Sequence, residues 1–205
     1  MMTRVVAYVD GFNLYHGLKA GYGRRYHWLD LQALVRSLLR PDQKLLEVQY
    51  FTARIRDNPD AELRQALYLE ALMSHSIRVR LIEGHFQDKP RECRNCGARW
   101  MVYEEKETDV NIAIAMLTDA VSDVYDTALL VSADSDLRPA VAAVKRMCRG
   151  KRIVAAFPPH RRSKDLAQAV DGYVSVSHTK VRNAQLPPEI VTRGGVKLTR
   201  PAYWS

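Results

Sequence analysis

The stretch Leu129-Leu130-Val131-Ser132-Ala133-Asp134-Ser135-Asp136 carries two carboxylates one residue apart, directly after a run of apolar residues. The run 127–131 predicts a buried strand, and from about residue 136 onward apolar residues recur at helical spacing. Asp134 and Asp136 therefore fall where a strand ends and a helix begins, which is the edge that binds ligands in open parallel sheets. Two acids held together there repel each other unless a cation or a raised pKa compensates. In the alternative interpretation, Asp136 is a helix N-cap and Asp134 a turn residue.

The N-terminal stretch repeats this arrangement of strand, acid and helix. Apolar residues 4–9 predict a short strand that runs into Asp10-Gly11-Phe12-Asn13, and apolar residues at helical spacing follow. Gly11 lets the backbone turn closely, and Asn13 can orient a ligand or a water through its amide. Taken alone, an Asp-Gly-x-Asn sequence is typical of many turns.

The rest of the chain alternates predicted helices with predicted strands. Helices are indicated over 29–39 and from 59 to 72, and strands over 45–53, 77–82 and 151–157. This alternation predicts an α/β fold, with a mostly parallel sheet flanked by helices. The segment 85–103 interrupts it and predicts a small Cys-containing hairpin insertion. Residues 185–205 are rich in Pro, Gly and basic side chains, so we expect a loosely ordered basic tail after a domain spanning 1–184.

The insertion contains the chain's only closely spaced cysteines, Cys93 and Cys96, followed by Gly97. This pattern is similar to half of a zinc knuckle, but tetrahedral Zn²⁺ needs four ligands and the sequence has no second pair. A structural Zn²⁺ at Cys93 and Cys96 is therefore less favoured than a hairpin with an exposed or transiently oxidised thiol pair. The basic and aromatic residues around the cysteines could also contact RNA by charge and stacking.

A further acid, Asp109, precedes residues 110–117, which are apolar on nearly every face and predict a central buried helix. Thr108 is the candidate N-cap, which places Asp109 in the first turn, where the helix dipole stabilises a carboxylate by ~0.3–1 kcal/mol. That stabilisation alone would explain why an Asp occurs at position 109, without any function. The functional explanation is that a buried helix presents its N-terminus at the edge where the strands end. Lys106 could screen the acids or contact a phosphate.

Positive charge gathers late in the chain. The net charge is +8, but residues 138–205 contain 14 Lys and Arg against 3 Asp and Glu, whereas residues 1–137 are slightly acidic. A basic region of this kind suits a polyanionic partner, with nucleic acid as the leading candidate. Arg161, Arg162 and Lys164 surround a predicted helix N-terminus and form a candidate anion site, although a solvated charged loop explains them equally well.

Several classes of protein are not supported by the sequence. No apolar run reaches the ~18 residues of a membrane span, and the N-terminus lacks the features of a signal peptide. We therefore expect a cytoplasmic protein without membrane contact, and a homo-oligomer stays open. The sequence lacks the glycine-rich loops that bind nucleoside triphosphates or dinucleotides, and the Gly-x-Ser-x-Gly nucleophile elbow.

The acids share one topological position. Asp10, Asp134 and Asp136 each follow a predicted strand, and Asp109 opens a central helix, so a doubly wound sheet can bring all four to one edge. Four carboxylates in a basic protein are best explained by a hard divalent cation, Mg²⁺ or Mn²⁺. Such a cation activates water and polarises phosphate, which suits phosphodiester hydrolysis.

Three motifs in order resemble the NYN domain family of the PIN-like nuclease superfamily: residues 8–15, 105–111 and 131–139. The resemblance extends over about residues 4 to 180 and implies a Rossmann-like fold with divalent-metal-dependent ribonuclease activity. Carried over by position, the four acids are Asp10, Asp109, Asp134 and Asp136, and Asn13 and Ser132 match supporting positions. We predict a metal-dependent endoribonuclease. The side chains that we expect to guide the phosphate backbone of its RNA substrate are Lys106, Arg161, Arg162 and Lys164. The main alternative is a non-catalytic nucleic-acid-binding regulator with a structural metal; a phosphatase of small substrates fits less well.

Overall fold

The structure is a computed structural model that describes residues 2–56, 58–93 and 96–204, with only the backbone of residues 85–91 and 100–106. Its centre is a seven-stranded sheet in the order β4-β3-β2-β1-β5-β6-β7. All neighbouring strands are parallel except the antiparallel pair β3 and β4. The predicted α/β fold with a mostly parallel sheet is therefore confirmed. The strands are β1 Thr3–Asp10, β2 Gln43–Ala53, β3 Val79–Glu92, β4 Arg99–Lys106, β5 Thr127–Val131, β6 Arg152–Phe157 and β7 Gly172–Ser175.

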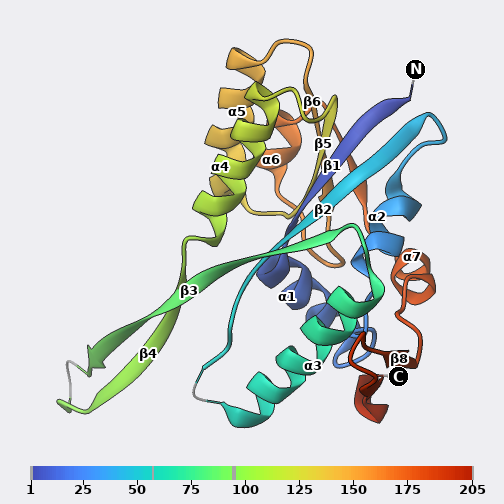
Figure 1. The fold of residues 1–205 in the computed structure, drawn as a ribbon. Coiled ribbons are helices and arrows are strands. Elements are labelled where there is room, and N and C mark those ends of the chain that lie inside the picture. The colour runs from blue at the N-terminus through green and yellow to red at the C-terminus, as the bar shows by residue number, and fades with distance from the viewer. Residues whose placement is uncertain (1, 57, 94–95, 205) are drawn as a thin grey trace.

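Helices cover both faces of this sheet (Figure 1). One hydrophobic cluster joins the sheet to helices α1, α2, α3 and α7, and a second joins the opposite face to α4, α5 and α6. Successive residues of β1 alternate between the two clusters, with Val5 and Ala7 in the first and Val6 and Tyr8 in the second, because side chains of a strand point to opposite faces. The helices are α1 Gly11–Tyr22, α2 Leu31–Leu38, α3 Pro59–His75, α4 Thr108–Val121, α5 Arg138–Met147, α6 Lys164–Ala169 and α7 His178–Asn183.

Local capping signals set several helix starts. Asp30 accepts a hydrogen bond from the backbone N–H of Ala33 and so begins α2, as its position in the sequence predicts. Ser163 begins α6 in the same way, through the N–H of Leu166. No helix within the described ranges is both long enough and apolar enough to cross a membrane.

The insertion is a β-hairpin that projects from the body of the molecule (Figure 1). After its pairing with β2 ends at Gly84, β3 continues, and residues 85–92 pair with residues 99–106 of β4. The expected hairpin is therefore present. Cys93 and Cys96 lie at its tip and form no disulfide. The side chain of Lys106, at the end of β4, lies outside the described residues.

Helix α4 is less buried than its composition predicts. Ile112, Met116 and Ala120 enter the core, but Val110, Ile114 and Val121 are 58%, 59% and 62% exposed. The prediction of a helix buried all round is therefore wrong, because the sheet and α5 cover only one of its faces. The N-cap also differs from the prediction. It is Glu107, in a left-handed conformation with φ of 76°, and Thr108 is the first helical residue.

The C-terminal segment is ordered, contrary to the expected loose tail. Strands β8 Glu189–Val191 and β9 Lys197–Thr199 pair antiparallel, and apolar side chains of the segment join the first core cluster. Trp204 is buried, with its ring centroid 6.0 Å from that of Trp28. Widely spaced apolar residues anchor this segment without a periodic pattern. A search for periodicity therefore does not predict that the segment packs against the core.

Candidate active site

The predicted acids lie at the point where the sheet reverses its winding. From β1 the chain proceeds outward through β2 and β3, whereas β5 lies on the other side of β1 and leads outward through β6 and β7. In such sheets the loops that follow the two central strands diverge and leave a crevice, which is where ligands bind. Val9 of β1 pairs with Val131 of β5, so Asp10 and Ser132 leave the sheet side by side.

Asp10 is a buried carboxylate with both oxygens hydrogen-bonded. Its Oδ1 accepts a bond of 2.9 Å from the backbone N–H of Asn13 and thereby caps α1. Its Oδ2 accepts a bond of 2.8 Å from the Ser132 hydroxyl. Gly11 is required beside it, since an added Cβ would lie 2.6 Å from the carbonyl oxygen of Phe51. The start of α1 is thus packed closely against β2.

Asn13 and Ser132 tie the β1 and β5 loops together. The Asn13 side-chain oxygen accepts a bond of 3.1 Å from the backbone N–H of Ala133. The Ser132 hydroxyl also accepts a bond of 3.0 Å from the backbone N–H of Asp134. Both side chains are buried. They therefore hold the loop with the two acids against Asp10.

Asp134 and Asp136 lie in the loop after β5. The Oδ1 of Asp134 accepts a bond of 2.9 Å from the backbone N–H of Asp136 and begins a short 3₁₀ helix, Ser135–Leu137. The capping role thus falls on Asp134, not on Asp136 as the alternative interpretation has it. Capping uses one oxygen only. Within the described part of the chain, Asp134 Oδ2 and both oxygens of the exposed Asp136 have no hydrogen-bond partner.

Asp109 faces this loop from the first turn of α4. Partial burial, together with the negative charges of Asp10, Asp134 and Asp136, raises the pKa of its carboxyl to about 6. Burial is also the main reason that the pKa of Asp10 is raised, with a contribution from Asp134. We call these four residues the carboxylate cluster, because their charges act on one another across three separate segments of the chain.

The three predicted cationic side chains of the β6–α6 region lie in different surroundings. Arg161 lies close enough to the carboxylate cluster for its charge to lower the pKa of Asp10. Arg162 is directed elsewhere: its guanidinium lies over the Tyr173 ring, 5.3 Å from the centroid. Lys164 is exposed at the start of α6. Of these three side chains, Arg161 is therefore the one that the structure brings to the cluster.

His16 is a neighbour that the sequence analysis did not single out. It lies on α1, one turn after Asn13, and its side chain is exposed. Partial burial of the imidazole, together with the charges of Arg161 and Lys19, lowers the pKa of His16. The sequence signal that could have indicated His16 is its spacing from Asn13, because residues three apart are neighbours on the surface of a helix.

Comparison with known proteins identifies the family of the chain. The family model described as the NYN domain matches residues 4–177. The chain belongs to the NYN domain family. A relative from Pseudomonas putida (strain DSM 28022 / S16), named 6-hydroxy-3-succinoylpyridine 3-monooxygenase HspA, is 34% identical over 180 residues, which cover 71% of this chain and 56% of that protein. This NYN domain chain thus spans little more than half the length of that relative.

A solved structure has a similar fold. It is the crystal structure of a protein of unknown function from Vibrio parahaemolyticus, with a TM-score of 0.55 and 17% sequence identity. The match covers 86% of this chain and 94% of the other. At this identity the likeness concerns the fold alone.

The carboxylate cluster of this NYN domain fits a hard divalent cation in charge and in donor type. Carboxylate oxygens are the ligands that Mg²⁺ and Mn²⁺ prefer, and the charges of Asp10, Asp134 and Asp136 add to burial in raising the pKa of Asp109. Among the described residues, no three acidic, His or Cys side chains already surround a single point closely enough to hold a metal. A cation would therefore have to draw these carboxylates together.

Proposed function

We propose that this NYN domain hydrolyses RNA phosphodiester bonds with Mg²⁺ or Mn²⁺ held by Asp10, Asp109, Asp134 and Asp136. The observation that supports the proposal most directly is the electrostatic coupling of Asp109 to the other three acids at the winding reversal of the sheet. A cluster of negative charge disfavours a phosphate substrate unless a cation lies between them. The presence of the carboxylate cluster in a basic protein therefore favours a metal-dependent reaction on a polyanion.

Each residue of the site then has a chemical role. Asp10, Asp109, Asp134 and Asp136 would hold the metal, which would lower the pKa of a water and polarise the phosphate. Ser132 and Asn13 hold Asp10 and the β5 loop in register, so that the carboxylates are oriented before a metal arrives. Arg161, whose charge lowers the pKa of Asp10, would donate hydrogen bonds to a phosphate oxygen beside the cluster. Water attacks phosphorus, the bond to the leaving oxygen breaks, and a proton passes to that oxygen.

The charge distribution supports nucleic acid as the substrate. Residues 138–205 contain 14 Lys and Arg against 3 Asp and Glu, and this part of the chain includes Arg161 beside the cluster. Positive charge attracts the phosphate backbone irrespective of base sequence. It favours a polymer over a small uncharged substrate.

The test is cleavage of labelled RNA with Mn²⁺ and with EDTA, by the unaltered chain and by Asp134→Asn. The substitution keeps the shape and the cap but removes one ligand charge, so we expect the rate to fall on the order of 100-fold or more. Glu70→Gln, an exposed substitution on α3, is the matched control and should cleave normally. Metal-independent cleavage, or equal cleavage by Asp134→Asn, would contradict the proposal. RNA binding by both proteins without any cleavage would favour the non-catalytic regulator.

A second candidate function is oxygenation of a hydroxylated pyridine. It is favoured by one observation, the 34% identity to the Pseudomonas putida protein named as a 6-hydroxy-3-succinoylpyridine 3-monooxygenase. Monooxygenation consumes O₂ and two electrons, so the assay supplies 6-hydroxy-3-succinoylpyridine with a two-electron reductant and follows O₂ uptake. Substrate-dependent O₂ uptake without RNA cleavage would replace the ribonuclease proposal.

A further inference from the structure

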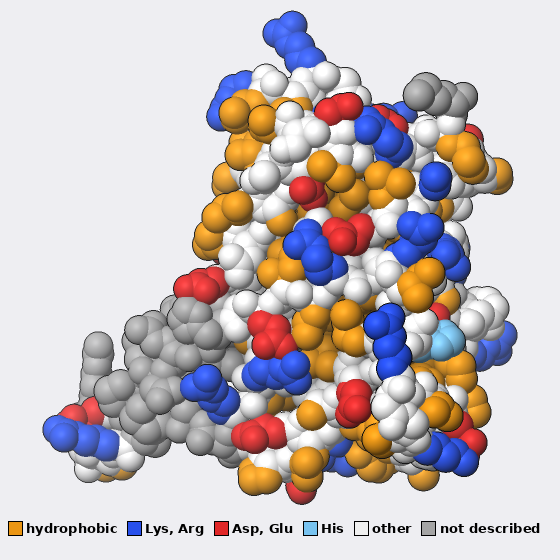
Figure 2. Space-filling view, viewed as in Figure 1, with side chains coloured by type: hydrophobic (Ala, Val, Ile, Leu, Met, Phe, Trp, Pro, Cys, Tyr) orange, Lys and Arg blue, Asp and Glu red, His pale blue; other side chains and the backbone are white. Residues whose placement is uncertain are grey.

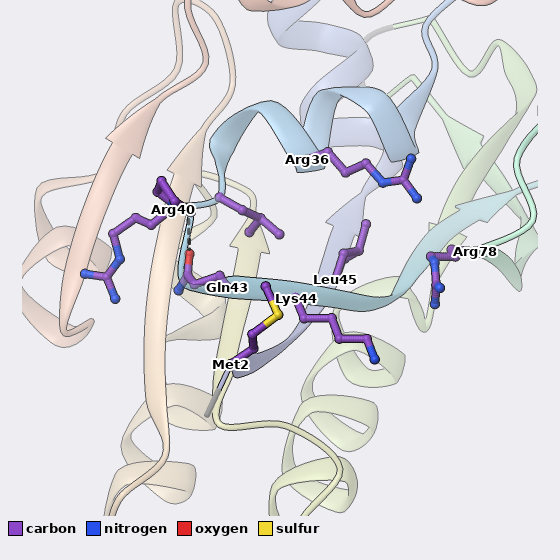
Figure 3. Close-up of a pocket in the computed structure, with 9 residues that line it drawn as sticks. Met2, Arg36, Arg40, Gln43, Lys44, Leu45 and Arg78 are labelled. Carbon is purple, nitrogen blue, oxygen red and sulfur yellow. Dashed lines mark hydrogen bonds between the residues drawn. The ribbon is translucent and has the colours of Figure 1, made fainter.

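A pocket lined by basic side chains lies at the opposite edge of the sheet from the carboxylate cluster. The pocket, of about 490 Å³, opens between the end of α2 and the first residues of β2, with Arg78 contributed from just before β3 (Figure 3). The acids lie at the carboxyl ends of the strands, whereas this pocket lies where the strands begin. Since β1 has 8 residues, the two sites are separated by about 26 Å, the length of that strand.

Four cations line this pocket, and its lining includes no acid: Arg36, Arg40, Lys44 and Arg78. Arg40 is paired with Asp42 at 3.5 Å, and Figure 3 shows it pointing away from the other three. Within the described residues, Arg36 and Lys44 have no ion-pair partner, and both are exposed. On the face shown in the space-filling view, basic side chains are interspersed with acidic ones over the rest of the molecule (Figure 2). The pocket therefore presents positive charge that the protein does not neutralise.

Two of these cations have defined positions in the fold. The Arg78 guanidinium donates a bond of 3.0 Å to the carbonyl oxygen of Leu46, and its backbone N–H donates to the Gln32 side chain at 2.9 Å. Lys44 belongs to β2 and is paired in register with Arg4 of β1. Positive charges that line one pocket repel one another, and an anion relieves that repulsion.

Apolar side chains also line the pocket. They are the buried Leu45 of β2, and Leu39 and Pro41 from the turn after α2. Apolar side chains beside cations suit a nucleotide, whose base packs on apolar surface while its phosphate pairs with guanidinium and ammonium groups. A bare inorganic anion would use the cations alone.

We propose that this pocket is a second nucleotide-binding site, remote from the carboxylate cluster, which takes a phosphorylated nucleotide on Arg36, Lys44 and Arg78. The nucleotide can belong to an RNA strand or be free in solution. In the first case the site is a further contact for the substrate and rests on the proposed function. In the second case it is independent of that function.

The test compares binding by Arg36→Gln/Lys44→Gln with binding by Arg146→Gln/Arg149→Gln. Both double variants remove two exposed positive charges, but Arg146 and Arg149 lie outside the pocket lining. Fluorescein-labelled oligouridylate is titrated in EDTA, which prevents metal-dependent cleavage, at several salt concentrations. Loss of two phosphate contacts should weaken binding by about tenfold and reduce the slope of log K against log salt by about 1.4 in the pocket variant only.

A fluorescent mononucleotide distinguishes the two sources. If oligouridylate binding weakens in the pocket variant and not in the control, the site takes an RNA strand. If only mononucleotide binding weakens, it takes a free nucleotide. If neither ligand distinguishes the pocket variant from the control, and both variants melt as the unaltered chain does, the proposal is overturned. The cleavage assay with Asp134→Asn is separate, so its failure leaves this binding result intact.

Discussion

Replacing Asp109 by Asn should stabilise the metal-free protein at neutral pH. In the folded chain the pKa of Asp109 is raised from 3.8 to about 6, because its carboxyl is partly buried and faces three other carboxylates. A folded-state pKa above the unfolded value means that the folded state binds the proton more tightly. Stability contributed by the protonated carboxyl is therefore present at low pH and is lost as the pH rises through about 4 to 6.

The size of the effect follows from that shift. A shift from 3.8 to about 6 corresponds to roughly 3 kcal/mol between the two protonation states, at about 1.4 kcal/mol for each pKa unit. More than a third of the Asp109 residue is still exposed despite the partial burial of its carboxyl, so water screens its charge and about 1 kcal/mol is the realistic expectation. For a chain of 205 residues, about 1 kcal/mol raises the melting temperature by roughly 2–4 °C.

The assay is urea denaturation in EDTA at about pH 7.5 and again near pH 4, where the carboxyl is protonated in the folded state. Asp109→Asn should be more stable than the unaltered chain at the higher pH, and the difference should shrink towards zero at the lower. Glu70→Gln, exposed on α3 away from the cluster, controls for the loss of one negative charge. Added Mn²⁺ should stabilise the unaltered chain more than Asp109→Asn, because the variant lacks one ligand charge.

An Asp109→Asn protein that is equally stable or less stable at about pH 7.5 in EDTA would refute this reasoning. It would mean that the acids do not repel one another across the cluster. The case for a divalent cation would then lose its electrostatic basis, whatever the RNA assay shows.

Three further substitutions test how the site and the core are held. Ser132→Ala removes the hydrogen bond to the buried Asp10 Oδ2 and should lower the free energy of unfolding in urea by about 1–3 kcal/mol. Losing that bond also raises the pKa of Asp10, so the acidic limb of any pH–rate profile should move to higher pH, and an unmoved limb would contradict this. Gly17→Ala places a Cβ 2.7 Å from a carbonyl oxygen of the β6–α6 loop and should destabilise by about 1–3 kcal/mol; an unchanged urea midpoint would contradict that packing. Trp204→Ala should cost about 3 kcal/mol and the exposed Tyr203→Ala far less, whereas equal small losses would indicate that the C-terminal segment does not dock.

The local parts of the fold could be predicted from the sequence with good accuracy. The strand Thr127–Val131 was expected over 127–131, and the side chains of Asp30 and Ser163, each directly before its helix, cap α2 and α6. These features depend on residues a few positions apart, because the periodicity of side chains and the capping of backbone N–H groups are both local. For the same reason, the sequence placed Asp10 and Asp134 after strands.

What the sequence by itself determined is therefore the set of elements and the chemistry at their ends: an alternation of strands and helices, and acids where three segments meet the sheet edge. Only the tertiary structure decided that β1 lies beside β5, so that Ser132 reaches Asp10, and that Asp109 feels the charges of the cluster. It also decided which face of α4 stays exposed, how Trp204 anchors the C-terminal segment, and that cations from α2, β2 and the start of β3 share one pocket. The physical reason is that the order of strands follows from long-range burial of apolar faces, and no local pattern in the chain reports which faces will meet.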